Sequence, residues 1–305
     1  MCAQQKYGKV SGNLETEVYG KMCSYTRNGK QFFRKAKSAD KGEVAVGKRM
    51  GAMALANVNV VYKAMLPLLE DTMAINEKDE RQKLFRSRNA KYCHFALTPE
   101  EVDKGGSIVN EYVVSKGNLP KIEIDEWGTS SIALPGIKKL DRFMKKGDVC
   151  KAILEGNKDW KEGDVLVFVR ARQMMTDENV PIIDGAIIRM VMDVTDEEIL
   201  GMAWPQDSMD VTDGKMSYSG GNEAVGYCWI HLRPADKAEK FGVEQYGDAS
   251  TQQLKITNMQ EIQAQYRTVE RVKMAIEAWE KRRLEKKEKP KEKPKKTVEE
   301  MIKGW

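Results

Sequence analysis

The sequence predicts an α+β protein: an N-terminal β-hairpin and helices, an antiparallel β-sandwich-like domain, a long C-terminal helix and an extended basic tail. Three observations predict this class. Residues 19–35 have a hairpin pattern, an Ala-rich stretch after residue 42 repeats apolar residues at helical spacing, and short β-rich runs follow from about residue 107. Strands at such spacing, without helices between them, favour an antiparallel sandwich or barrel. The expected regions are 1–106, 107–257, 258–288 and 289–305.

The first region combines the hairpin with helices. Asn28-Gly29 is the favoured two-residue type I′ turn, because both positions need positive φ, and β-compatible residues lie on both sides. A helix is predicted over 42–73, and Pro67 should kink or end it. Asn76 can cap a second helix that ends near Cys93. A capping box at 98–101 then begins a third helix.

The second region consists of short strands separated by turns. Ile122 and Ile124 alternate with acidic residues, and the run 165–169 alternates valines. Asp184-Gly185 lies between two β-rich runs, which predicts another hairpin. Further β-rich runs are ILGMAW at 199–204, KMSYSG at 215–220, AVGYCWIHL at 224–232 and LKIT at 254–257.

The third region is expected to be one long helix from Asn258, which could cap it together with Glu261. Its apolar residues repeat every seven positions and form a coiled-coil-like seam about three heptads long. The seam consists of Ile262, Val269, Val272, Ile276 and Trp279. Two interpretations stay open: self-association through the seam, or packing of the helix on the β domain.

The net positive charge of the chain lies in one basic arm, residues 280–296, at the end of the long helix and the start of the tail. Residues 280–296 contain ten Lys or Arg and four Glu, a local net charge of +6, whereas the whole chain has +5. A final apolar stripe follows at helical spacing, consisting of Val298, Met301, Ile302 and Trp305. Thr297 and Glu300 form a capping box, but nine residues are too few for a stable isolated helix. The stripe is therefore predicted to dock on a partner, and the alternative is a frayed, solubilising tail.

No catalytic, cofactor or metal site is predicted. Residues 42–48 match the phosphate-loop spacing G-x-x-x-x-G-K, but Arg49 stands where a Ser or Thr hydroxyl should bind magnesium. The segment also reads as the start of a helix.

Histidine supply limits metal and nucleophilic chemistry. The two histidines are His94 and His231, so the candidate metal pairs are Cys93-His94 and Cys228/His231. In a strand, positions 228 and 231 point to opposite faces, and core packing is the better interpretation. The acids at 207, 210 and 213 lack calcium-loop spacing and predict a polar turn. Paired carboxylates with a hydrolase function stay an open alternative.

Charge and cysteine usage bear on partners and location. The basic arm contains no aromatic residue for base stacking, so contact with nucleic acid is expected to be weak. No run approaches the eighteen apolar residues of a membrane span, and no signal peptide is evident. The five cysteines have no CxxC pair, which predicts reduced thiols in a cytoplasmic protein.

The N-terminal region and a later motif resemble a family of Bacteroidota and phage-encoded proteins. The matching positions are Gly8, Gly12, Asn13, Val18, Gly29, Arg34 and the SKGNLP motif, residues 115–120. The family has no established enzyme activity, and its phage members look like virion structural proteins of crAss-like phages. Two features depart from the family pattern: Lys35-Ala36-Lys37 and the basic arm.

The resemblance implies a non-enzymatic structural protein of a tailed-phage virion, as a capsid-attached or head–tail connector or ring component. It would assemble in the bacterial host cytoplasm with capsid, portal or ring subunits, with a homo-oligomer expected in the particle. The alternatives are a nucleic-acid-contacting protein and a host-encoded binding module.

Overall fold

The computed structural model describes residues 13–16, 20–27, 30–35, 46–69, 72–73, 78–201, 208–234, 246–258 and 260–288. The chain divides into two compact units, residues 1–45 and 46–305. The predicted α+β class is confirmed. The division follows residue 45 and not residue 106, because the first helices share one core with the β domain.

The first unit contains a three-stranded antiparallel sheet with the order β1-β2-β3. Its strands are β1 (Asn13–Thr16), β2 (Gly20–Arg27) and β3 (Lys30–Lys35). Arg27 pairs with Lys30, which confirms a hairpin with a two-residue connection. The connecting residues themselves, Asn28 and Gly29, lie outside the described residues.

The second unit contains all the helices of the described chain. They are α2 (Val46–Leu69), α3 (Lys78–Asn89), the 3₁₀ turn η1 (Ala90–Tyr92), α4 (Pro99–Asp103), α5 (Lys146–Gly156), α6 (Gln260–Gln265) and α7 (Val269–Glu288). Pro67, expected to kink or end the first helix, lies inside α2, which continues for two more residues and ends at Leu69. The predicted capping box is present at α4, where Thr98 N donates to Glu101 Oε2 at 2.8 Å and Glu101 N donates to Thr98 Oγ1 at 3.3 Å.

Two antiparallel sheets complete the second unit. The larger has the order β10-β9-β5-β6, with β11 also paired to β9, and the smaller has the order β4-β8-β7. The strands of the larger sheet are β5 (Val165–Met175), β6 (Pro181–Val191), β9 (Val225–Pro234), β10 (Tyr246–Ala249) and β11 (Lys255–Thr257). Those of the smaller sheet are β4 (Thr129–Ala133), β7 (Met209–Thr212) and β8 (Lys215–Tyr218).

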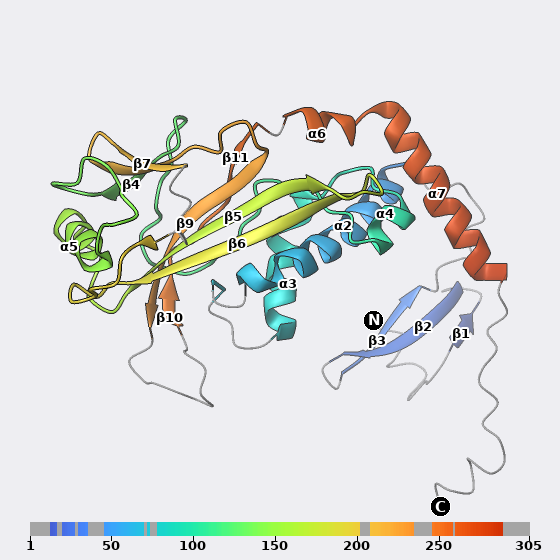
Figure 1. Ribbon diagram of the computed structural model, residues 1–305. Helices are drawn as coiled ribbons and strands as arrows, with labels where there is room; N and C mark the ends of the chain where they lie inside the picture. Colours follow the sequence, from blue (N-terminus) through green and yellow to red (C-terminus); the bar gives the residue numbers. More distant parts are fainter. Residues whose placement is uncertain are drawn as a thin grey trace, which may run out of the picture. The chain divides into compact units, whose positions relative to one another are not determined.

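The central strands of the larger sheet, β5 and β9, are buried on both faces over most of their length, and two apolar cores lie on these faces. Side chains alternate along β5, so Val167 and Val169 pack with Leu68 of α2 on one face. Phe168 points to the other face and packs with Met216 of the smaller sheet. Figure 1 shows α5, β4 and β7 gathered at one end of the long strands. Two sheets with a core between them agree with the sandwich-like arrangement expected from the sequence.

The hairpin predicted at Asp184-Gly185 is wrong. Both residues lie inside β6, where Gly185 pairs with Ala171, and the β5–β6 turn lies at residues 176–180. A Cβ at position 185 would come within 2.8 Å of Leu68 Cδ1. Glycine therefore serves close packing of α2 on the sheet and not a turn.

The expectation of strands alone between residues 107 and 257 is also wrong, because α5 lies in this region. Its apolar residues Val149, Cys150 and Ile153 follow helical spacing and are buried in the second core. An 11-residue helix therefore covers part of the larger sheet where only turns and strands were expected.

The predicted long helix over 258–288 is two helices. The chain turns at residues 266–268, where Tyr266 is buried and Thr268 Oγ1 accepts from Arg271 N at 3.2 Å to cap α7. Asn258 does not cap α6, since its side-chain amide donates to Gly221 O and its φ is 52°.

Helix α2 is long and apolar enough to cross a membrane by length and composition alone. Half of its most apolar window is buried inside the protein, including Val58, Val61 and Met65. This burial is what the core helix of a folded domain requires.

Candidate docking surface

The predicted docking residues lie outside the described part of the chain. They are Val298, Met301, Ile302 and Trp305. The whole predicted tail, residues 289–305, also lies outside the described residues. Docking through its final apolar stripe therefore stays a prediction.

The predicted self-association seam faces the body of the protein. Val272, Ile276 and Trp279 pack on a small core formed by Met53 of α2, Ala96 and Ala275. Trp279 Nε1 also donates to Leu97 O at 2.9 Å. Ile262 packs against the first core, and only Val269 is well exposed, at 63%. The structure thus favours the second interpretation of the periodicity, a helix lying on the domain, because four seam residues already have partners within the chain.

Polar contacts hold α7 in the same place. Arg271 pairs with Glu101 of the capping box and donates from Nε to Ala96 O at 3.1 Å. Arg282 pairs with Asp103 at 2.8 Å. Arg49, which breaks the phosphate-loop motif, forms an ion pair with Glu280 at 2.7 Å. Part of the basic run is therefore used within the chain.

A buried polar cluster is the strongest candidate for chemistry, and we call it the Asp164 cluster. It consists of Trp160, Asp164, His231 and Arg233. Asp164 Oδ2 lies 2.6 Å from His231 Nε2 and 2.8 Å from Arg233 Nη2, while Arg233 Nε donates to Oδ1 at 2.9 Å. The Trp160 ring stacks on the imidazole with a centroid separation of 3.9 Å. His231 is a residue that the sequence alone assigned to core packing.

The charges in this cluster are mutually satisfied. Burial lowers the pKa of His231 and outweighs its bond to Asp164, which favours a neutral ring that donates to the carboxylate. Burial alone would raise the pKa of Asp164, but hydrogen bonds from Arg233 and His231 lower it overall. The side chains of Asp164 and His231 are almost inaccessible to solvent. Because Asp164 precedes β5 and His231 lies on β9, we interpret the cluster as a structural lock that joins these two strands.

The described cysteines pack in the two apolar cores rather than around one shared site. Cys228 packs in the first core, whereas His231 lies on the opposite face, as predicted from strand alternation. Burial raises the pKa of the Cys93 thiol to about 12, which keeps it protonated. Among the described residues, no group of three His, Cys, Asp or Glu could hold a metal ion.

The SKGNLP motif has a structural role. Ser115 Oγ donates to Ser250 O at 2.6 Å, and Leu119 N donates to Ala249 O at 3.0 Å. A Cβ at Gly117 would lie 2.0 Å from Ala249 O, so only glycine allows the two segments to approach this closely. The motif fixes a crossing of the chain beside β10.

Two loops form a short antiparallel ladder at the start of α5. Lys145 bridges Ile199, and Leu200 N donates to Met144 O at 2.9 Å. Because side chains alternate along such a ladder, Met144 and Leu200 point into the second core, while Phe143 and Ile199 point outward.

Two further contacts fix this ladder. A Cβ at Gly147 would lie 2.6 Å from Val194 O, so glycine lets α5 begin directly against the second loop. Asp141 Oδ1 accepts from Phe143 N at 2.8 Å and closes a tight turn. The outward residues therefore stand on a backbone that close packing and hydrogen bonds hold in place.

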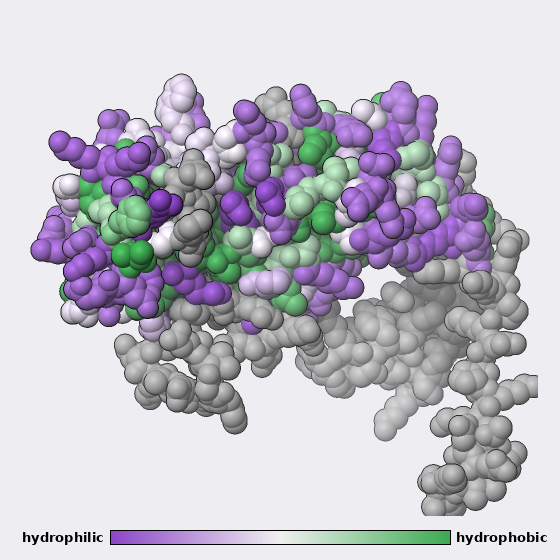
Figure 2. Space-filling view, in the orientation of Figure 1, coloured by the Kyte–Doolittle hydropathy of each residue, from purple (hydrophilic) through white to green (hydrophobic). Residues whose placement is uncertain are grey.

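We call the outward residues Phe143 and Ile199 the Phe143 face. Their exposed fractions are 67% and 51%. The Arg142 guanidinium lies 4.8 Å from the Phe143 ring centroid, and ion pairs Lys145–Glu197 and Lys146–Glu198 border the face. Figure 2 shows hydrophobic residues at the surface, among hydrophilic ones, at the end of the second unit that carries α5.

The sequence did not single out this face. The run 137–146, IKKLDRFMKK, mixes basic and apolar residues, and nothing in that pattern tells which apolar residues face outward. The ladder with residues 196–201 decides this, and it joins segments about fifty residues apart.

Comparison of the chain with protein-family models, with curated proteins and with solved structures finds no match.

Proposed function

We propose that the protein is a non-enzymatic structural component of a tailed-phage particle and that the Phe143 face binds a neighbouring subunit of that particle. The resemblance of the N-terminal region and the SKGNLP motif to the phage-encoded family supports a role in the particle. That role would be as a capsid-attached or head–tail connector or ring component. The exposure of Phe143 at 67% on a fixed backbone is the observation that carries the docking role.

The composition of the face supports a protein partner. Aromatic residues and Arg are enriched at the centres of protein interfaces, and charged residues gather at the rim. Phe143 and Arg142 provide the first, and the two Lys–Glu pairs provide the second. Two adjacent outward apolar residues on one ladder also form a larger patch than a singly exposed side chain would.

The test measures incorporation into particles. The full chain, tagged, is produced during particle assembly in the bacterial host, and the particles are banded on a density gradient. The double variant Phe143→Asp/Ile199→Asp should lower the amount of chain per particle at least about tenfold, because burying either carboxylate opposes docking. A chain that ends at Lys296 is measured in the same experiment. It tests docking through the predicted apolar stripe, Val298 to Trp305.

Trp127→Ala is the matched control, since it removes a similarly exposed aromatic residue from another surface of the same unit. Unchanged melting temperatures show that the variants fold. Equal incorporation of the double variant and the control contradicts docking through the Phe143 face. Absence of the unmodified chain from every particle fraction contradicts the particle role itself.

A further inference from the structure

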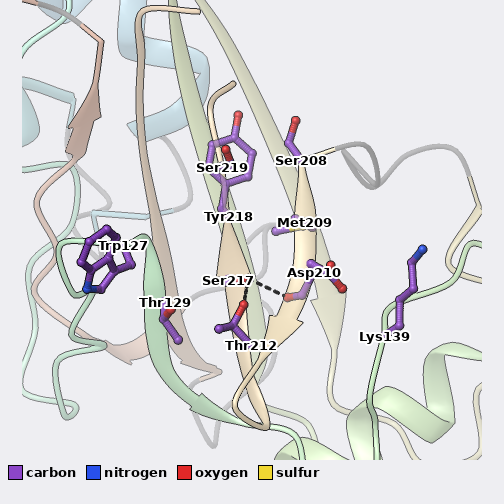
Figure 3. A pocket seen from close by; sticks show the side chains of 10 residues that line it. All are labelled: Trp127, Thr129, Lys139, Ser208, Met209, Asp210, Thr212, Ser217, Tyr218 and Ser219. Carbon is purple, nitrogen blue, oxygen red and sulfur yellow. Dashed lines mark hydrogen bonds between the residues drawn. The ribbon is translucent and has the colours of Figure 1, made fainter. Parts of the chain in front are cut away.

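A groove of about 600 Å³ lies on the outer side of the smaller sheet, away from its core (Figure 3). Its described lining combines hydroxyl groups with a Trp, a Lys and an Asp. The lining residues are Trp127, Thr129, Lys139, Ser208, Met209, Asp210, Thr212, Ser217, Tyr218 and Ser219. We call it the Trp127 groove.

Trp127 stands at the tip of a tight hairpin and is 82% exposed. The hairpin closes where Ser131 N donates to Glu123 O at 2.8 Å, and Asp125 Oδ1 accepts from Trp127 N at 2.9 Å. The tip is therefore held by backbone hydrogen bonds and by a carboxylate, not by burial of the indole.

Gly128 anchors this tip to the smaller sheet. Tyr218 N donates to Gly128 O at 3.1 Å, and a Cβ on Gly128 would lie 2.3 Å from Tyr218 O. Its φ of 88° is also a conformation that favours glycine. The backbone that carries the exposed indole therefore loses little freedom when a ligand stacks on the ring.

A row of hydroxyl groups extends from the Trp across three strands. Thr129 pairs with Ser217, and Ser217 pairs with Asp210, so their side chains lie side by side on the outer face. Thr212 Oγ1 lies 3.1 Å from Ser217 Oγ. Figure 3 shows Trp127 on one side of this row and Lys139 on the other.

The charges of the groove decide between ligand classes. Among the described residues that line the groove, the charged ones are Lys139 and Asp210, and neither forms an ion pair within the described part of the chain. One cation beside one anion gives no field that attracts a phosphate backbone, so a single-stranded nucleic acid would lack the cationic track that it needs. A neutral ligand rich in hydroxyl groups fits better, because hydroxyl, carboxylate and ammonium groups together donate and accept hydrogen bonds.

We propose that the Trp127 groove binds a neutral saccharide. The flat apolar face of the indole covers the C–H face of one sugar ring, and the row of hydroxyl groups with Asp210 and Lys139 bonds the hydroxyls of the next. The groove runs across strands and is open along its length, which suits an oligosaccharide chain. This inference does not depend on the proposed particle role.

The test uses the full chain and five neutral oligosaccharides: cellohexaose, xylohexaose, laminarihexaose, mannohexaose and maltohexaose. Binding is followed by the change in Trp fluorescence and by calorimetry at millimolar concentrations. At least one oligosaccharide should bind, and Trp127→Ala should weaken its binding at least about tenfold. Asp210→Asn, a second exposed variant, should weaken binding without changing the melting temperature.

Phe143→Ala is the matched control and should bind like the unmodified chain. Failure of all five oligosaccharides to bind the unmodified chain overturns the proposal. Equal binding by Trp127→Ala also overturns it, since the ligand would then lie elsewhere. Binding of poly(dT) that depends on Trp127, in place of oligosaccharide binding, assigns the groove to base stacking instead.

Discussion

The Asp164 cluster and the Trp127 groove contain the same kinds of residue in opposite states. Each combines a Trp, an Asp and a cationic side chain, and both lie in the β domain. In the Asp164 cluster every charged group points at another, and the carboxylate receives hydrogen bonds from His231 and Arg233. In the Trp127 groove Asp210 and Lys139 have no ion-pair partner among the described residues. Residue type alone therefore does not make a binding site, because partners within the chain can use up its hydrogen-bonding capacity.

The strongest test of this contrast replaces the same residue type in both regions. Asp164→Ala leaves His231 and Arg233 without their acceptor, and we expect it to lower the free energy of unfolding by about 3 kcal/mol. This is the low end for a broken buried pair, because Arg233 keeps 29% of its side chain exposed. Denaturant unfolding measures the change.

Asp210→Ala is the control for Asp164→Ala. Its side chain is exposed, so its cost should stay within about 0.5 kcal/mol. A loss below about 1 kcal/mol for Asp164→Ala would contradict a structural lock and return the cluster to consideration as a functional site.

The second comparison concerns apolar residues on α7. Ile276 packs against the body, whereas Val269 is 63% exposed. Ile276→Ala should lower the free energy of unfolding by roughly 1–2 kcal/mol, less than for a fully buried residue, and Val269→Ala should change it little. Denaturant unfolding and sedimentation velocity are measured on the same samples. Loss of an oligomer with unchanged stability after Ile276→Ala would revive the coiled-coil interpretation of the seam.

Local sequence signals predicted those elements whose determinants are close along the chain. The capping box of α4 and the pairing of Arg27 with Lys30 depend on neighbours within four residues, and both predictions are confirmed. The hairpin predicted at Asp184-Gly185 was wrong because glycine is needed there for another reason. Leu68, from a helix far away in the sequence, packs where a side chain at position 185 would lie. The seam had the right period, but periodicity cannot tell whether the partner is another chain or the same one.

The candidate surfaces were beyond sequence reasoning for a related reason. Trp127 and Trp229 are the same residue type, yet Trp127 is 82% exposed and Trp229 is completely buried in the second core. Trp127 is exposed because it stands at the tip of a hairpin. Trp229 is buried because it lies on β9, which is enclosed between two layers. Phe143 is exposed for a similar reason, since the ladder turns its neighbour Met144 into the second core and leaves Phe143 on the outward side.

The smallest expected effect is on the pH dependence of the free energy of unfolding, to which the Asp164 cluster should contribute and the Trp127 groove should not. Burial lowers the pKa of His231 below its ordinary 6.5, so the unfolded chain binds more protons than the folded chain at mildly acidic pH. The free energy of unfolding should therefore be constant above that value and fall as the pH drops through it. Asp164, with its pKa lowered from 3.8, contributes a further loss only in more acidic solution.

Thermal unfolding between neutral and mildly acidic pH, with His231→Gln as the variant, measures how the free energy of unfolding changes with pH. His231→Gln should flatten this slope, since glutamine can donate to Asp164 without titrating, whereas Trp127→Ala should leave it unchanged. Equal slopes for His231→Gln and the unmodified chain would mean that folding leaves the pKa of His231 unchanged, and a stability that rises as the pH drops would mean that the folded protein holds the imidazole protonated as a charged pair with Asp164.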